Sequence, residues 1–298
     1  MYTALAQLGW SIRSISVKQL DDLHAEIEAH RRRGLFADEV YEMFGRHFSF
    51  ALPPERPDAH SIVIAAVPSP RVRVSLVVDG RAREFTVPPQ YARHAEVTET
   101  VRAMLAETVA PRGFGVTPAH LPLKLLAAGS GLGMYGRNNI LYVPTMGSHH
   151  QLVAYYSDAP SADEWDEPLV MARCQDCPAC IKACPTGAVT RERFLLRAER
   201  CITFFNEDPG DFPDWIAPSW HNSLVGCMHC QRVCPANAEV AGWQVPLVEF
   251  DAEETRHVLS GAQLDQLAPP TIVKLRQAGL DDCLTALPRN LAALLAIA

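Results

Sequence analysis

The chain lacks the segments that would carry it into or across a membrane. The C-terminal run LAALLAIA is far shorter than the ~20 apolar residues that a spanning helix needs. The opening MYTALAQLGW lacks the basic stretch followed by an apolar stretch that is typical of a signal peptide. We therefore expect a cytoplasmic protein with no membrane partner, whose cysteines stay reduced and form no disulfide framework.

An excess of basic residues is also missing. The formal net charge is −7 and the isoelectric point about 5.9, which argues against a protein that works mainly on nucleic acid. Hydrophobic residues make up 48% of the chain, so a core can be buried and widespread disorder is not expected.

The hydrophobic pattern predicts an α+β fold. Leu20, Leu23 and Ile27 form one apolar stripe of a helix over residues 17–33, which Ser16 caps and Gly34 ends. Asp79-Gly80 lies at the centre of a predicted hairpin. Further predicted elements are strands over 61–67, 139–143 and 152–156, helices over 91–110 and 118–128, and helices in the last ~60 residues with breaks at Pro246 and Pro269-Pro270. We expect an α/β domain over residues 1–165, a cluster domain over 166–245 and a helical segment over 246–298.

Nine cysteines are present, and eight follow an iron–sulfur pattern. The block CQDCPACIKACP matches the bacterial ferredoxin run C-x2-C-x2-C-x3-C-P, and CMHCQRVCP forms a second block. Three cysteines two residues apart wrap three corners of a cubane, while the fourth, three residues further on, points to the other cluster. We assign the first 4Fe–4S cluster to Cys174, Cys177, Cys180 and Cys234, and the second to Cys184, Cys201, Cys227 and Cys230.

Other interpretations of these cysteines are weaker. Four-coordinate structural zinc does not call for eight thiolates in this order. Cys283 is left over and is interpreted as a buried, inert thiol. The segment GLGMYG fits a dinucleotide fingerprint, but a helical stretch precedes it and a strand follows, which is the reverse of the required context.

The combined motifs resemble the epoxyqueuosine reductase family, corrinoid-dependent iron–sulfur enzymes distantly related to reductive dehalogenases. The resemblance is carried by the four-cysteine block, Arg200-Cys201-Ile202, the GCxxCQxxCP pattern that begins at Gly226, and GLGMYGRN at residues 131–138, which resembles the family's GLGWxGKN. Gly147-Ser148 resembles the GS that follows in the family.

This resemblance implies a nitroreductase-like α/β N-terminal domain that holds cobalamin, and a ferredoxin-like domain with two 4Fe–4S clusters. An external donor (a flavodoxin, a ferredoxin or a reductase) would supply electrons that reach the corrinoid and then a small-molecule or corrinoid substrate. The residues implied to bind the cofactor are Lys124, Gly131, Gly133, Gly136, Arg137, Asn138, Gly147 and Ser148. Tyr135 and Glu96 are the candidate catalytic residues.

Two departures from the family pattern bear on the substrate. Thr117 stands where the family has its proton-donating Asp, and a hydroxyl cannot replace a carboxylic acid. Only a short segment follows Cys234, so we do not expect tRNA-reading helical repeats. We therefore predict a divergent cobalamin-dependent reductase that does not act on tRNA. The alternatives are an electron-transfer protein without a corrinoid and, second, epoxyqueuosine reduction in tRNA itself.

Overall fold

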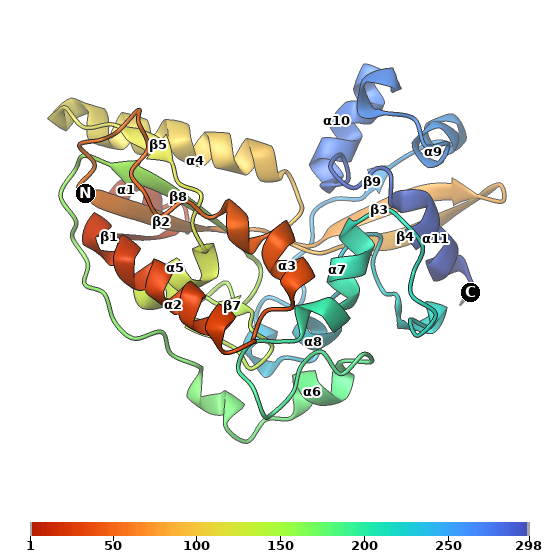
Figure 1. Ribbon diagram of the computed structural model, residues 1–298. Coiled ribbons are helices and arrows are strands. Elements are labelled where there is room, and N and C mark those ends of the chain that lie inside the picture. Colours follow the sequence, from red (N-terminus) through yellow and green to blue (C-terminus); the bar gives the residue numbers. More distant parts are fainter. Residues whose placement is uncertain (1, 297–298) are drawn as a thin grey trace. The chain divides into compact units, whose positions relative to one another are not determined.

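The computed structural model describes residues 2–296 as two compact units (Figure 1). The first comprises Met1–Pro68, Ala95–Pro178 and Val189–Glu199; the second comprises Ser69–His94, Ala179–Ala188 and Arg200–Ala298. The predicted α+β class is confirmed. None of the helices in the described residues combines the length and the apolar character needed to cross a bilayer.

The first unit is built on an antiparallel sheet with strand order β1-β2-β8-β5. These strands are β1 (Ser11–Ser16), β2 (Ser61–Pro68), β8 (His150–Ser157) and β5 (Val116–Pro118). Seven of the eight β2 residues are buried, as the unbroken run SIVIAAV predicts. The β2–β8 ladder runs from the Ser61–Ser157 pair to the Pro68–His150 pair, so residues 82 to 96 positions apart in the chain lie side by side.

Helices cover both faces of this sheet. Alternate side chains of β2 point to opposite faces, so Ile62 and Ile64 enter one core while Val63 enters the other. The first core includes residues of α2 (Leu20–Arg32) and α5 (Leu123–Gly129). The second includes residues of α1 (Thr3–Ala6) and α4 (His94–Val109). The unit also contains α3 (Asp38–Met43) and a small hairpin of β6 (Met134–Tyr135) and β7 (Leu141–Tyr142).

Two predicted elements of the first unit need correction. The helix expected over 118–128 begins only at Leu123, because Pro118 still pairs with β8 and Pro122 disfavours helical geometry in the residue before it. The strand expected over 139–143 is reduced to β7, because Asn139 adopts a left-handed φ of 57°. By contrast, the predicted apolar stripe of α2 is buried, the Ser16 side chain accepts a hydrogen bond from Lys18 N, and Gly34 has φ of 66°.

The second unit contains a sheet of order β4-β3-β9. Asp79 and Gly80, with φ of 50° and 71°, close the predicted hairpin of β3 (Val72–Val78) and β4 (Arg81–Val87). The remaining elements are β9 (Val248–Glu249), which is parallel to β3, and the helices α6 (Ala179–Ala183), α7 (Ile202–Glu207), α8 (His229–Arg232), α9 (Ala252–Leu259), α10 (Pro269–Ala278) and α11 (Leu287–Leu295).

The composition of the second unit differs from the contiguous ranges expected from the sequence. The hairpin of residues 72–87 shares one core with α9, α10 and α11, although about 165 residues separate it from them in the chain. As predicted, the helical stretch is interrupted before Pro269 and Pro270, which begin α10, where a proline's missing N–H costs nothing. Cys283 is buried in this core, and burial raises the pKa of its thiol to about 12.

His150 of β8 provides a pH-dependent contribution to stability. Burial lowers the pKa of His150 to about 4, and Nδ1 lies 3.1 Å from the Gly147 carbonyl oxygen. Because the unfolded chain takes up this proton near pH 6.5, the free energy of unfolding falls as the pH drops below that value. From pH 7 to pH 5 we expect His150 to account for about 2 kcal/mol of lost stability.

Chemical denaturation at the two pH values tests this contribution. His150→Asn keeps an N–H donor for Gly147 and should remove most of that loss. His120→Asn, the same substitution at an exposed histidine, is the control and should retain the loss of stability attributed to His150. An unchanged pH dependence in His150→Asn would contradict the prediction.

Candidate functional site

The four cysteines assigned to the second cluster all belong to the second unit. Cys184 directly follows α6, Cys201 is the residue before α7, and Cys230 lies in α8, which packs against α6. Burial raises the pKa of Cys201 to about 11, and the charges of Cys227 and then Cys184 add to the rise. Thiols that raise one another's pKa become thiolates readily only when a cation such as iron compensates their charge, so the cluster assigned to these four cysteines stays a prediction.

Neighbouring groups hold this cysteine set in place. Asn222 Nδ2 donates to Cys227 Sγ at 3.4 Å, and its Oδ1 accepts from Met228 N at 3.0 Å. Arg200 Nε donates to the Thr186 carbonyl at 3.1 Å, which joins the segment before Cys201 to the segment after Cys184. An N–H···S hydrogen bond of the kind that Asn222 makes raises the reduction potential of an iron–sulfur cluster.

The C-terminal helix α11 supports the same loop. Asn290 Nδ2 donates to the Asn206 carbonyl at 2.8 Å and to the Leu224 carbonyl at 2.9 Å. Asn206 Nδ2 in turn donates to the Gly226 carbonyl at 2.8 Å, next to Cys227. Both asparagine side chains are fully buried. The helical segment at the end of the described chain thus fixes the backbone that presents the second cysteine block.

The cysteines assigned to the first cluster are divided between the units. Cys174 and Cys177 belong to the first unit, while Cys180 and Cys234 belong to the second. Their common cluster therefore stays a prediction. Within the first unit the Cys174 turn is fixed by Arg137, whose Nε and Nη2 donate to the Cys174 carbonyl at 3.1 and 2.5 Å.

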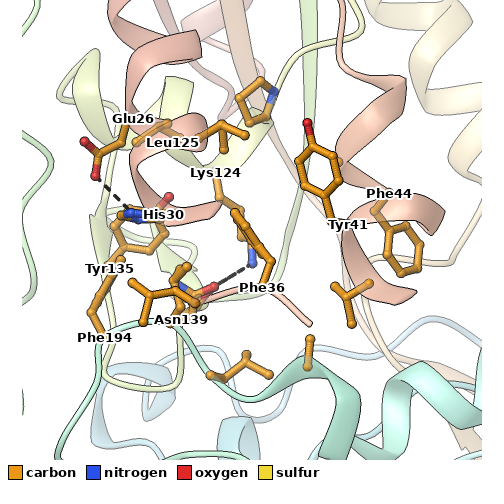
Figure 2. A pocket seen from close by; sticks show the side chains of 18 of the residues that line it. Glu26, His30, Phe36, Tyr41, Phe44, Lys124, Leu125, Tyr135, Asn139 and Phe194 are labelled. Carbon is orange, nitrogen blue, oxygen red and sulfur yellow. Dashed lines mark hydrogen bonds and ion pairs between the residues drawn. The ribbon is translucent and has the colours of Figure 1, made fainter. Parts of the chain in front are cut away.

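A cavity of about 640 Å³ opens in the first unit (Figure 2). Side chains of α2 and α3 form one wall, and the start of α5 and the β6–β7 hairpin contribute others. Most of its lining is apolar, including the aromatic rings of Phe36, Tyr41, Phe44, Phe48, Tyr135 and Phe194. Its size and its few polar groups are typical of a small-molecule or cofactor site.

Two polar atoms of the lining residues are buried without a hydrogen-bond partner. They are Asn139 Nδ2 and His30 Nδ1. Asn139 is already an acceptor, since Lys124 Nζ lies 3.1 Å from both its carbonyl oxygen and its Oδ1. His30 Nε2 is paired with Glu26 Oε1 at 3.4 Å, and burial lowers the pKa of His30. Unpaired buried groups cost free energy that a ligand with matching polar atoms would recover.

Of the predicted site residues, Lys124 and Tyr135 line this cavity. Burial, and then the charge of Glu26, raise the pKa of Tyr135 well above its ordinary value, so its hydroxyl stays protonated at neutral pH. Its ring meets Phe194 edge to face, with centroids 4.9 Å apart. Tyr135 therefore offers a proton rather than a base inside the cavity.

The other predicted cofactor contacts are not among the residues that line this cavity. They are Gly131, Gly133, Gly136, Arg137, Asn138, Gly147 and Ser148. A Cβ on Gly133 would lie 2.7 Å from the Tyr142 carbonyl oxygen, so this glycine permits close packing of the chain on itself. Asn138 Nδ2 donates to Tyr142 Oη at 3.0 Å. A role for these seven residues toward a cofactor stays a prediction.

Neither Glu96 nor Thr117 lines the cavity. Glu96 lies in the first turn of α4 and is exposed. Thr117 lies on β5, where its Oγ1 accepts from Arg56 Nε at 3.4 Å, and the Arg56 guanidinium pairs with Asp158 at 3.2 Å. The residues that sequence reasoning missed are Asn139, His30 and the aromatic set of residues 36–48. The local signal for the aromatic set is the unusual density of aromatic residues between 36 and 50.

Residues 173–237 match a family model described as a 4Fe-4S double cluster binding domain. An epoxyqueuosine reductase from Alicycliphilus denitrificans is 34% identical over 187 residues, which are 59% of this chain and 49% of that protein. The epoxyqueuosine reductase of Bacillus subtilis is 33% identical over 144 residues, 48% of this chain and 36% of that protein. The matched regions thus span about half or less of these relatives.

Solved structures show the same fold. An epoxyqueuosine reductase from Streptococcus thermophilus superimposes with a TM-score of 0.67 at 19% identity, covering 99% of this chain and 79% of that one. An epoxyqueuosine reductase with an epoxyqueuosine-modified tRNA-Tyr stem loop gives a TM-score of 0.61 at 20% identity, covering 96% of this chain and 76% of that one. The resemblance predicted from the sequence motifs is confirmed, as is the double-cluster domain.

Proposed function

We propose that this chain, which resembles the epoxyqueuosine reductases in sequence and fold, is an iron–sulfur oxidoreductase that delivers single electrons to a cobalamin in the cavity of the first unit. The main support for this proposal is the cavity, whose largely apolar lining includes the unpaired donor Asn139 Nδ2. The same chain also has a double-cluster domain. An external electron-donor protein is the proposed source of the electrons.

The donor atoms fit the proposed cofactors. Seven thiols in two ferredoxin-type blocks, with Cys201 between the blocks, suit two 4Fe–4S clusters. Among them, Cys201 lies within the field of Cys227 and Cys184 in the second unit. The cavity offers a broad apolar surface for a macrocycle, while Asn139 Nδ2 and Lys124 Nζ are donors for its amide oxygens. A bound corrinoid would supply low-potential one-electron and nucleophilic chemistry that no side chain provides.

The residues around the cavity have distinct proposed roles. The aromatic wall excludes water, and Asn139 orients the ligand through its amide. Tyr135 holds a proton at its hydroxyl and is the proposed proton donor, since Thr117 carries no carboxyl group and accepts a hydrogen bond from Arg56. Because the family's carboxylic acid is missing, we propose a small molecule or a corrinoid as the substrate rather than a tRNA.

Titration with cob(II)alamin tests this function. Anaerobically reconstituted protein should bind it at micromolar concentration and shift the cobalt EPR spectrum, because a largely apolar cavity would give the metal surroundings that differ from water. Protein denatured and then returned to buffer serves as the control for non-specific binding. Intact clusters with no cobalt shift at these concentrations would instead indicate an electron-transfer protein without a corrinoid.

A further inference from the structure

The helices that carry cluster cysteines bear charge of one sign only. Helix α6 (ACIKA) and helix α8 (HCQR) pack against each other in the second unit, and neither contains Asp or Glu (Figure 1). Their charged side chains are Lys182 and Arg232, and both are exposed. The chain as a whole has a formal net charge of −7, so the net charge of these two helices is opposite in sign to that of the chain.

A third cation, Arg71, belongs to the same unit and acts on Arg232 through its charge. Arg71 Nη2 donates to the Ala241 carbonyl at 2.7 Å, and Arg232 Nη2 donates to the Asn222 carbonyl at 3.3 Å. Carbonyl oxygens anchor both groups without neutralising them. Within residues 2–296, Lys182, Arg71 and Arg232 have no ion-pair partner.

This surface adjoins the cysteines and contains an apolar residue. Val233, which is 44% exposed, stands between Arg232 and Cys234. Asn222 connects the cation to the cysteine. Its side chain donates a hydrogen bond to Cys227 Sγ, and its backbone carbonyl accepts one from Arg232 Nη2. A small apolar spot with unneutralised cations around it, next to a redox centre, has the character of a transient docking site.

We propose that Lys182, Arg71, Arg232 and Val233 form a cationic face that docks the acidic surface of a one-electron donor protein, such as a reduced flavodoxin. This inference rests on the proposed function only in that the two clusters carry electrons. The face would steer the acidic donor by its field and hold it briefly through Val233, which suits a partner that must leave after each electron. The step moves one electron from the donor's reduced flavin to a 4Fe–4S cluster, so the flavin is oxidised and the cluster reduced.

Stopped-flow reduction of the clusters by a reduced flavodoxin provides the test. Lys182→Glu and Arg232→Glu, combined in one reconstituted chain, should lower the second-order rate constant at least about tenfold at an ionic strength near 0.01 M. The difference should largely vanish near 1 M salt, where the Debye length is only about 3 Å. Arg256→Glu, an exposed charge reversal on α9 of the same unit, is the matched control and should leave the rate unchanged.

A second reductant separates docking from damage to the clusters. The methyl viologen radical is a small cation that needs no docking face, so it should reduce the double variant at least as fast as the wild type. A variant slowed equally with both reductants, an unchanged flavodoxin rate, or an equal effect of Arg256→Glu would overturn the proposal. Because cluster absorbance is monitored in the absence of cobalamin, the result does not depend on whether a corrinoid binds.

Discussion

Replacing Cys201 with alanine is expected to halve the iron content of the reconstituted protein, from about eight to about four atoms per chain. Cys201 is partly buried in the second unit within the field of Cys227 and Cys184, so the change removes one corner of the predicted thiolate set. Iron and acid-labile sulfide assays measure the loss. EPR of the reduced protein should then show one cluster without magnetic coupling to a neighbour.

Cys283→Ala is the matched control, since it removes a buried thiol of the same unit that belongs to neither predicted set. It should retain about eight iron atoms, although the free energy of unfolding will fall because a core side chain is shortened. Loss of iron in Cys283→Ala, or full retention in Cys201→Ala, would contradict the ligand assignment.

Paired substitutions test which cysteines share a cluster. Cys201→Ala with Cys230→Ala removes two ligands of the same predicted cluster and should still leave about four iron atoms. Cys201→Ala with Cys234→Ala removes one ligand from each cluster and should leave almost none. The opposite ranking of the two double variants would show that Cys230 and Cys234 are exchanged between the predicted clusters.

The cysteine motifs and the local elements were predictable because the geometry of a cluster or a helix fixes the spacing of the residues that form it. A cubane requires thiolates at fixed short intervals, and the buried stripe of Leu20, Leu23 and Ile27 follows from helical periodicity alone. Asp79 and Gly80 tolerate the left-handed φ values of a tight hairpin, so their position in the chain is sufficient to place the turn. These features depend on residues within a few positions of one another.

The cavity and the unit boundaries depend on distant residues, and no local pattern encodes them. Phe36 and Tyr41 line the same cavity as Tyr135 and Phe194, although 94 to 158 positions of the chain separate the first two from the last two. Likewise, the hairpin of residues 72–87 joins the C-terminal core through β9, which pairs with β3 in parallel. The resemblance led to the glycine segment 131–138, yet Tyr135 alone from that segment lines the cavity, and the next residue, Asn139, provides the unpaired donor.

Replacing Asn139 with aspartate is expected to weaken cobalamin binding about tenfold, the effect of losing about 1.4 kcal/mol from an unpaired buried donor that a ligand would engage. Aspartate tolerates the left-handed φ of 57° and keeps the oxygen that Lys124 Nζ contacts at 3.1 Å. The fold should therefore persist while the Nδ2 donor is lost. Titration with cob(II)alamin, followed by cobalt EPR, measures the change in affinity.

The neighbouring Asn138→Asp is the matched control, because it makes the same chemical change one residue away. Asn138 is equally buried, but its Nδ2 donates to Tyr142 Oη and it does not line the cavity. We expect this variant to lose thermal stability and to retain its affinity for cobalamin. If Asn138→Asp weakens binding and Asn139→Asp does not, the corrinoid contacts the glycine segment as the family resemblance implies, and the role proposed for Asn139 is wrong.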